Sequence, residues 1–310
     1  LAQADRIELL TGPTTRNFGL NAFSGAVNIR TDPADSLSIG ALTEAGQYGL
    51  LRASVQASIP AGPVKTLVAF NHAVSGGYMP NTDFRSDGGF LHSEAAFERI
   101  LLEVMAGWSE KDFGANAFYT PRFSEQYEET GTGFAALKWK VPGGNHTLKG
   151  QLYIRRHTDH FMLFRSDPDA YQNFHHTLTS GGNISGTLRS VLGFTTVTME
   201  LRQEGIRSTS LGEVAENPRS VPGTDSVYYH RTYNRYHLSL AVNHTLERGR
   251  LMISGGAFFQ SGLDRKIDPG LYPGIDLSFR TGDRTRLYAS LNRSMRLPTF
   301  TDLFYEGPQN

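Results

Sequence analysis

The sequence predicts an all-β protein, and within that class an antiparallel transmembrane β-barrel. The chain has 33 glycines, 19 phenylalanines and 13 tyrosines, a composition that favours strands and turns over helices. From Ser36 onward apolar and polar residues alternate with a period of two. Short turns alternate with long polar loops along the chain, as they do in outer-membrane barrels.

The alternation predicts about thirteen strands. We expect them near residues 36–44, 47–59, 64–75, 95–109, 113–119, 129–141, 146–156, 177–188, 190–206, 229–247, 250–262, 271–280 and 284–296. Short turns are expected at 60–63, 110–112, 142–145, 247–249 and 281–283, and long loops at 76–94, 157–176 and 207–228. In outer-membrane barrels the short turns lie on the periplasmic side and the longer loops lie outside the cell.

One face is apolar and free of charge from Ile100 to Ala106 and from Leu148 to Ile154, as the lipid-facing side of a barrel requires. In strand 95–109 this face carries Ile100, Val104 and Trp108. Trp108 and Trp139 are expected just before short turns, where aromatic residues line the membrane interface. A soluble sandwich produces the same alternation, so the pattern alone leaves both architectures open.

Charge and cysteine content exclude several functions. The 30 Lys and Arg residues balance the 30 Asp and Glu residues, so no basic excess indicates a nucleic-acid partner. The absence of cysteine excludes disulfides, thiolate metal sites and a cysteine nucleophile. We find no GxSxG motif, no phosphate loop and no spaced Ser-His-Asp set, and we expect neither an enzyme nor a cofactor.

Near the N-terminus a strand-like RIELLTGP is followed by a glycine-containing loop and then by GAVNIR. This ordered string resembles the last plug-domain motif of TonB-dependent outer-membrane receptors. The matching positions are Arg6, Glu8, Gly12, Pro13, Gly19, Gly25 and Asn28, and the departures are Thr11, Phe18 and Ala26. MRLPTFTDLFY, at 295–305, is similar to a segment at an extracellular loop of the same family, through Arg296, Pro298, Asp302 and Leu303.

The resemblance implies a division of the chain into the C-terminal end of a plug domain, 1–33, and the N-terminal part of a β-barrel, 34–310. Barrels of this family have roughly 22 strands. An open sheet in lipid would leave backbone groups unpaired. We therefore expect one piece of a split, cleaved or partly represented receptor, which is completed by a plug and strands from elsewhere.

The resemblance also implies a function, namely energy-coupled uptake of a scarce nutrient across the bacterial outer membrane. The expected partners are the TonB complex, acting through the plug, outer-membrane lipid and a small nutrient ligand; the remaining barrel segment and a surface lipoprotein are further candidates. Haem is less favoured, because haem receptors of the family place a histidine near this segment and none lies in 295–310. A cobalamin-like corrinoid is slightly favoured over a ferric siderophore, because the R-x-P-x-x-x-D-L segment is similar to that of cobalamin receptors. The alternatives are a passive porin or adhesin barrel and a barrel-embedded hydrolase.

The predicted loop 157–176 and its flank carry the candidate ligand-binding residues. They are Arg156, His157, Asp159, His160, Phe161, Arg165, Tyr171, His175 and His176. Arginines suit acidic groups and aromatic rings suit flat or apolar surfaces. The histidines and the aspartate leave a metal or haem contact open, but we assign no metal site.

Overall fold

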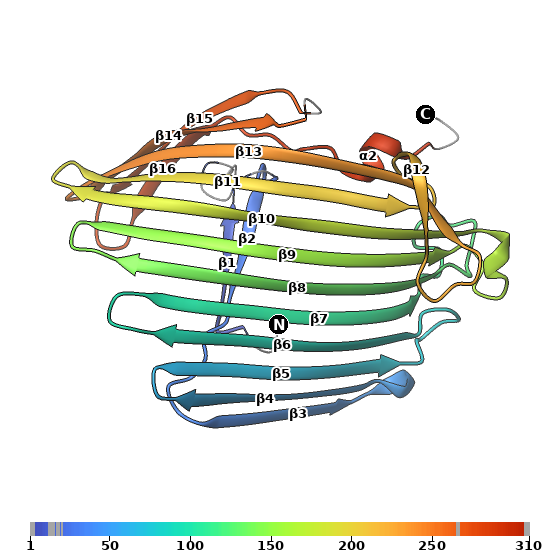
Figure 1. Cartoon of the computed structure of the whole chain (residues 1–310). Coiled ribbons are helices and arrows are strands. Elements are labelled where there is room, and N and C mark those ends of the chain that lie inside the picture. Colours follow the sequence, from blue (N-terminus) through green and yellow to red (C-terminus); the bar gives the residue numbers. More distant parts are fainter. Residues whose placement is uncertain (1–3, 12–15, 17–18, 20, 265–266, 307–310) are drawn as a thin grey trace.

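The computed structural model describes the chain except residues 1–3, 12–15, 17–18, 20, 265–266 and 307–310. It contains two antiparallel sheets, a two-stranded hairpin and a 14-stranded sheet (Figure 1). The hairpin consists of β1 (Arg6–Thr11) and β2 (Gly25–Arg30). In the described part of the chain, no helix has the length and apolar character needed to cross a membrane.

Neighbouring strands in the large sheet are nearly always neighbours in sequence. The strands are β3 (Ser38–Ala45), β4 (Leu51–Ala61), β5 (Val64–Ser75), β6 (Phe84–Ala96), β7 (Leu101–Gly114), β8 (Tyr127–Pro142), β9 (His146–Met162), β10 (Gln172–Ser190), β11 (Gly193–Ser208), β12 (Glu213–Ser220), β13 (Tyr228–Arg248), β14 (Leu251–Gly262), β15 (Gly270–Arg280) and β16 (Arg286–Asn292). β11 pairs with β13, β12 pairs with β13 alone, and the path ends at β3 and β16. The antiparallel β-sheet expected from the sequence is confirmed.

The two ends of the sheet differ as the sequence predicts. At one end the strands are joined by short turns at 62–63, 97–100, 143–145, 191–192, 249–250 and 281–285. At the other end the connections include 76–83, 115–126, 163–171 and the stretch between β11 and β13 that contains β12. Two short 3₁₀ helices, Gln47–Gly49 and Pro168–Ala170, also lie in connections of this second end, which we call the loop end.

The predicted loop 76–94 is wrong over its second half, because β6 begins at Phe84. The predicted strand 95–109 combines the end of β6, a turn and the start of β7, and the predicted turn 110–112 lies within β7. Glycines interrupt the apolar–polar alternation of β6, so the sequence does not indicate this strand. Glycine is required at Gly89 because a Cβ there would lie 2.5 Å from Nε1 of Trp108 on the neighbouring strand. Trp108 therefore lies within β7 and not just before a short turn.

The predicted strand 113–119 is also wrong beyond Gly114. Ala117 has a φ of 54°, a left-handed conformation that a strand does not contain. The amide of Phe118 donates to the carbonyl of Ala115, 3.0 Å away, which closes a turn. The strand count on the main path agrees with the prediction because this false strand offsets the missing β6.

The large sheet has a polar face and an apolar face. The polar face, here called the inner face, carries the contacts with the N-terminal segment: Asn243 Nδ2 donates to the carbonyl of Arg16 at 3.1 Å, and Thr31 Oγ1 lies 3.1 Å from His92 Nδ1. The opposite, outer face leaves apolar side chains accessible, with Leu152 53% and Ile154 47% exposed. Polar residues inside and apolar residues outside are typical of a membrane barrel, not of a soluble sandwich.

Candidate functional site

The nine candidate ligand residues are divided between two faces of the sheet and one loop, because most of them lie on strands. β9 continues to Met162 and β10 begins at Gln172, so the loop between them is only 163–171. Successive strand residues point to opposite faces of the sheet. His157, Asp159, Phe161 and His175 take the inner face; Arg156, His160 and His176 share the outer face with Ile154; and Arg165 and Tyr171 lie in the loop.

The inner-face candidates are held by neighbours on adjacent strands. His157 Nδ1 lies 2.8 Å from Thr132 Oγ1, and His175 Nδ1 lies 2.8 Å from Ser208 Oγ. Phe161 meets the ring of Tyr119 edge to face, with centroids 5.4 Å apart. These contacts fix the rings and leave the second nitrogen of each histidine for another partner.

Asp159 is the inner-face candidate with the most unusual environment. Its Oδ1 is buried and has no hydrogen-bond partner among the described residues. The apolar band on the outer face of β9 ends at Ile154, so Asp159 and His175 lie beyond it, toward the loop end. Burial, and to a smaller extent the nearby Glu128, raises the pKa of Asp159 to about 6. Burial lowers the pKa of His175 to about 4, so its imidazole is neutral at pH 7.

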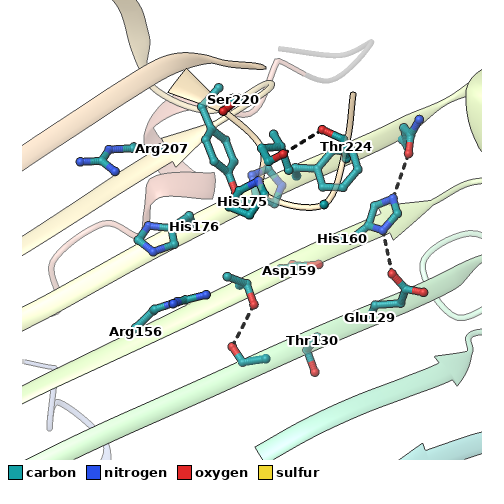
Figure 2. Close-up of a pocket in the computed structure, with 18 of the residues that line it drawn as sticks. Glu129, Thr130, Arg156, Asp159, His160, His175, His176, Arg207, Ser220 and Thr224 are labelled. Carbon is teal, nitrogen blue, oxygen red and sulfur yellow. Dashed lines mark hydrogen bonds and ion pairs between the residues drawn. The ribbon is translucent and has the colours of Figure 1, made fainter. Parts of the chain in front are cut away.

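The outer-face candidates Arg156, His160 and His176 line a groove of about 950 Å³, and Asp159 and His175, whose side chains take the inner face, also border it (Figure 2). In Figure 1 the β1–β2 hairpin lies behind the large sheet and the β12 segment crosses in front of it, on the outer face. Phe174 is the floor of the groove: it packs under Val221 and Tyr229, and the ring of His160 stacks on it at 3.9 Å. His160 also contacts Glu129 and Gln172, each at 2.9 Å, so both of its ring nitrogens are engaged.

Charge is divided across this groove. Arg156, Arg207 and Arg219 line it, and within the described part of the chain none of the three forms an ion pair. Carboxylates on its other side come from Glu110, Asp112 and Glu129. Guanidinium groups beside carboxylates suit a ligand that bears both signs of charge. The β12 segment covers this groove on the outer face of the sheet.

The two loop candidates differ in their availability. Arg165 donates from Nη1 to Asp83 Oδ1 at 2.7 Å, and its guanidinium lies 4.0 Å from the centre of the Tyr127 ring. It therefore joins two connections of the loop end and is not free for a ligand. Tyr171 is 48% exposed and accepts a hydrogen bond from Asn173 at 3.0 Å.

A charged network deeper on the inner face was missed in the sequence. Arg235 Nε donates to Glu204 Oε2 at 2.7 Å, and Arg202 Nη2 donates to Glu204 Oε1 at 2.6 Å. Beside them, His237 is 1% exposed and neither ring nitrogen has a partner in the described structure. The available signal was the R-x-E spacing, which puts Arg202 and Glu204 on one face of a strand.

The C-terminal motif, residues 295–305, contacts this network. Arg235 Nη1 donates to the carbonyl of Pro298 at 2.7 Å. After Pro298, Thr299 and Asp302 form a capping box for the helix α2 (Phe300–Phe304), and Asp302 also binds Arg296 at 2.6 Å. Leu303 within α2 is 43% exposed.

The N-terminal motif residues form the β1–β2 hairpin, in which Asn28 Nδ2 donates to Glu8 Oε2 at 2.9 Å and Arg6 pairs with Glu8 at 2.6 Å. Gly25 begins β2, and Gly19 has a φ of 79°, which favours glycine. Gly12 and Pro13 lie outside the described residues.

The two motifs also meet in space. The amide of Leu297 donates to Asn21 Oδ1 at 3.0 Å, and Ser294 Oγ donates to the carbonyl of Phe23 at 3.3 Å. Leu297 is 4% exposed. Segments from the two ends of the sequence therefore form one contact on the inner face of the sheet.

A long-stranded sheet, polar inside and apolar outside, with a plug-like hairpin against its inner face, defines a class: the chain has the fold of TonB-dependent receptor barrels. Among solved structures it is similar to the siderophore receptor PirA from Pseudomonas aeruginosa (16% identity, TM-score 0.74, 96% of this chain and 50% of that one). It is also similar to the FrpB iron transporter from Neisseria meningitidis (12%, 0.76, 96% and 52%) and to the copper transporter OprC (16%, 0.74, 96% and 51%).

The chain thus spans about half the length of these structures. No protein-family model matches the sequence, and a search of curated proteins finds no match. The resemblance inferred from the two motifs is confirmed as a likeness of fold. The three neighbours are named for siderophore, iron and copper, so they lend no support to the preference for cobalamin.

Proposed function

We propose that this chain forms the end of the plug, 1–33, and the N-terminal part of the barrel, 34–310, of a TonB-dependent receptor in the bacterial outer membrane. The receptor imports a scarce nutrient and catalyses no reaction. The observation that carries the proposal is the β1–β2 hairpin against the inner face of a sheet whose fold is that of nutrient receptors.

The nutrient that we favour is a ferric chelate of the siderophore type. The named neighbours support this class, whereas the corrinoid preference rests on the segment from Arg296 to Leu303 alone. The uptake experiment described below therefore also measures uptake of a corrinoid. The partners implied are the TonB complex, acting on the plug, and outer-membrane lipid around the apolar band.

We propose that the nutrient binds on the inner face at the loop end, beside His157, Asp159, Phe161 and His175. Asp159 and His175 offer unpaired hydrogen-bonding atoms there, and Phe161 offers an aromatic surface. The outer-face residues Arg156, His160 and His176 have no part in this contact.

The test uses the protein expressed from its complete gene in a deletion strain. We expect uptake of a ferric catecholate to disappear on deletion and in a TonB-null background. His175→Ala combined with Asp159→Ala weakens ligand binding by about 30-fold, the loss of two hydrogen bonds of about 1 kcal/mol each. The matched control is His176→Ala, because it removes the next imidazole along the strand from the opposite face.

Three outcomes contradict the proposal in different ways. Uptake that persists without TonB indicates a passive pore, which planar-bilayer conductance would detect. Equal losses for His175→Ala and His176→Ala place the ligand elsewhere. TonB-dependent uptake of cyanocobalamin but of no ferric chelate keeps the receptor and replaces the ligand.

A further inference from the structure

A second cluster of polar side chains lies on the inner face, at the end of the sheet with the short turns. His92 and Glu94 are two residues apart on β6 and share a face, and Glu103 lies directly opposite Glu94 on β7. The nearest ligand atoms of all three side chains lie within 4.8 Å of one another. None of these residues was a candidate in the sequence, because part of β6 was expected to be a loop.

His92 is directed at the two carboxylates without a hydrogen bond to either. Its side chain is 4% exposed, and its Nε2 is buried without a hydrogen-bond partner in the described structure. That nitrogen lies 3.6 Å from Glu94 Oε1 and 3.9 Å from Glu103 Oε2. Both separations exceed hydrogen-bond length. Two atoms that bind the same cation through bonds of about 2.1 Å lie about 3.0–3.6 Å from each other. A small shift of the flexible glutamate side chains would bring the three ligand atoms to this spacing.

The other ring nitrogen orients the imidazole for this role. His92 Nδ1 lies 3.1 Å from Thr31 Oγ1, in the segment that joins β2 to β3. If Nδ1 carries the proton and donates to Thr31, Nε2 presents its lone pair to the carboxylates. A ligating histidine is held in the same way when its second nitrogen donates to an oxygen of the protein.

Charge in the neighbourhood also favours a cation. Two like charges directly opposite on adjacent strands destabilise a sheet. Lys138 Nζ lies 3.6 Å from Glu103 and compensates one of them. Lys65, opposite Glu94, forms its ion pair with Asp35 instead. Among the described residues, Glu94 has a charged-pair contact with His92 alone.

We propose that His92, Glu94 and Glu103 bind one divalent first-row transition metal ion. One imidazole and two carboxylates form a mixed nitrogen and oxygen set that suits Zn²⁺, Fe²⁺ or Mn²⁺. The ion joins β6 to β7 and, through the bond from His92 to Thr31, holds the segment that follows the hairpin. The site is resident in the barrel wall and independent of the nutrient proposed above.

The experiment is a metal titration of the protein expressed from its complete gene, purified in detergent and stripped with a chelator. Co²⁺ alone is added and its visible absorption bands are recorded, followed by competition with Zn²⁺. We expect one equivalent to bind. His92→Gln and, separately, Glu103→Gln lower the affinity by at least about 100-fold, and Thr31→Val, which removes the positioning contact, lowers it by about tenfold.

The matched control is His244→Gln on β13, at the same end of the sheet. Both nitrogens of His244 are engaged, with Thr195 Oγ1 at 2.9 Å and with the carbonyl of Leu192 at 3.1 Å, so its variant binds Co²⁺ as the parent does. Heat-modifiable mobility on gels shows that each variant is folded. Folded parent protein that binds no Co²⁺, or folded His92→Gln and Glu103→Gln that bind it as tightly as the parent, overturns the proposal.

Discussion

The inner and outer faces of β9 and β10 at the loop end are built from consecutive residues, yet they have different surroundings. The side chain of His175 contacts Ser208 on the inner face, whereas its neighbour His176 lies on the outer face, beneath the hairpin that β12 forms with the start of β13 (the β12 hairpin). Asp159 lies buried without a full set of partners, whereas the next residue, His160, has a partner at each ring nitrogen. Between the apolar band and the loop end both faces are polar. The two faces there differ in the residues that pack against them and not in polarity.

The same comparison separates two kinds of stabilisation. The inner face depends on buried ion pairs such as that of Arg235 with Glu204, and the outer face at the loop end depends on apolar contact between Phe174 and the β12 hairpin. Loss of an inner-face partner leaves a charge uncompensated. Loss of an outer-face ring releases one hairpin. The predictions below test this difference.

The largest effect is expected for Arg235→Ala. Glu204, whose side chain is 9% exposed, then keeps only Arg202, and the carbonyl of Pro298 loses its donor. We expect the free energy of unfolding to fall by about 3 kcal/mol, since one partner of a buried pair is removed. Urea titration in lipid vesicles measures this loss. The control is Arg219→Ala in the outer groove; a loss of equal size there would remove the distinction between the faces.

A smaller and local effect is expected for Phe174→Ala. Phe174 is 8% exposed beneath Val221 and Tyr229, and its loss frees the hairpin without opening the sheet. We expect opening of the hairpin to become easier by about 2 kcal/mol, so that proteolysis within residues 213–227 is about 30-fold faster. Phe161→Ala, on the inner face, leaves this cleavage unchanged. A fall in global stability without faster cleavage contradicts the local role.

The smallest effect is expected for Asp159→Asn, and it depends on pH. The pKa of Asp159 is raised to about 6 in the folded protein by burial, so the folded state binds more protons than the unfolded state between about pH 4 and 6. Stability is therefore lost as pH rises through this window. Asn keeps the neutral form, so the variant is more stable at pH 7 by about 1 kcal/mol and equal to the parent below about pH 4.

Urea titrations of both proteins at pH 4 and pH 7 test this prediction. His157→Gln serves as the comparison, because its imidazole lies on the same face but carries no buried carboxylate charge. A stabilisation by Asp159→Asn that is the same at both pH values would mean that the charge of Asp159 is not its cause.

The strand pattern was predictable wherever one face is apolar. Leu152 and Ile154 on β9 alternate with polar residues and define the outer face from sequence alone. Beyond Ile154 both faces are polar, so the alternation disappears while the strand continues to Met162. For this reason the candidate cluster was interpreted as a loop, and its division between two faces was not predicted.

The other failures share a cause, because they depend on contacts between strands. Gly89 looks like a loop residue until Trp108 is found lying over it, and Glu103 becomes a neighbour of Glu94 only through the β6–β7 register. The alternation within one strand does not tell which residues of the neighbouring strand lie opposite it. The division of the candidate residues at the loop end between the inner and outer faces likewise depends on how the strands pair.

Because these 310 residues contain no cysteine, the neighbours His175 and His176 offer a pair of labelling positions with no competing thiol in this part of the receptor. A thiol at His175→Cys and one at His176→Cys differ by a single peptide bond but project from opposite faces of β10. A bulky, water-soluble maleimide therefore has to reach each thiol from a different face of the sheet. The reagent is applied to intact cells with and without a bound nutrient. The thiol whose reaction slows when the nutrient is bound shows which side of the barrel wall the nutrient occupies.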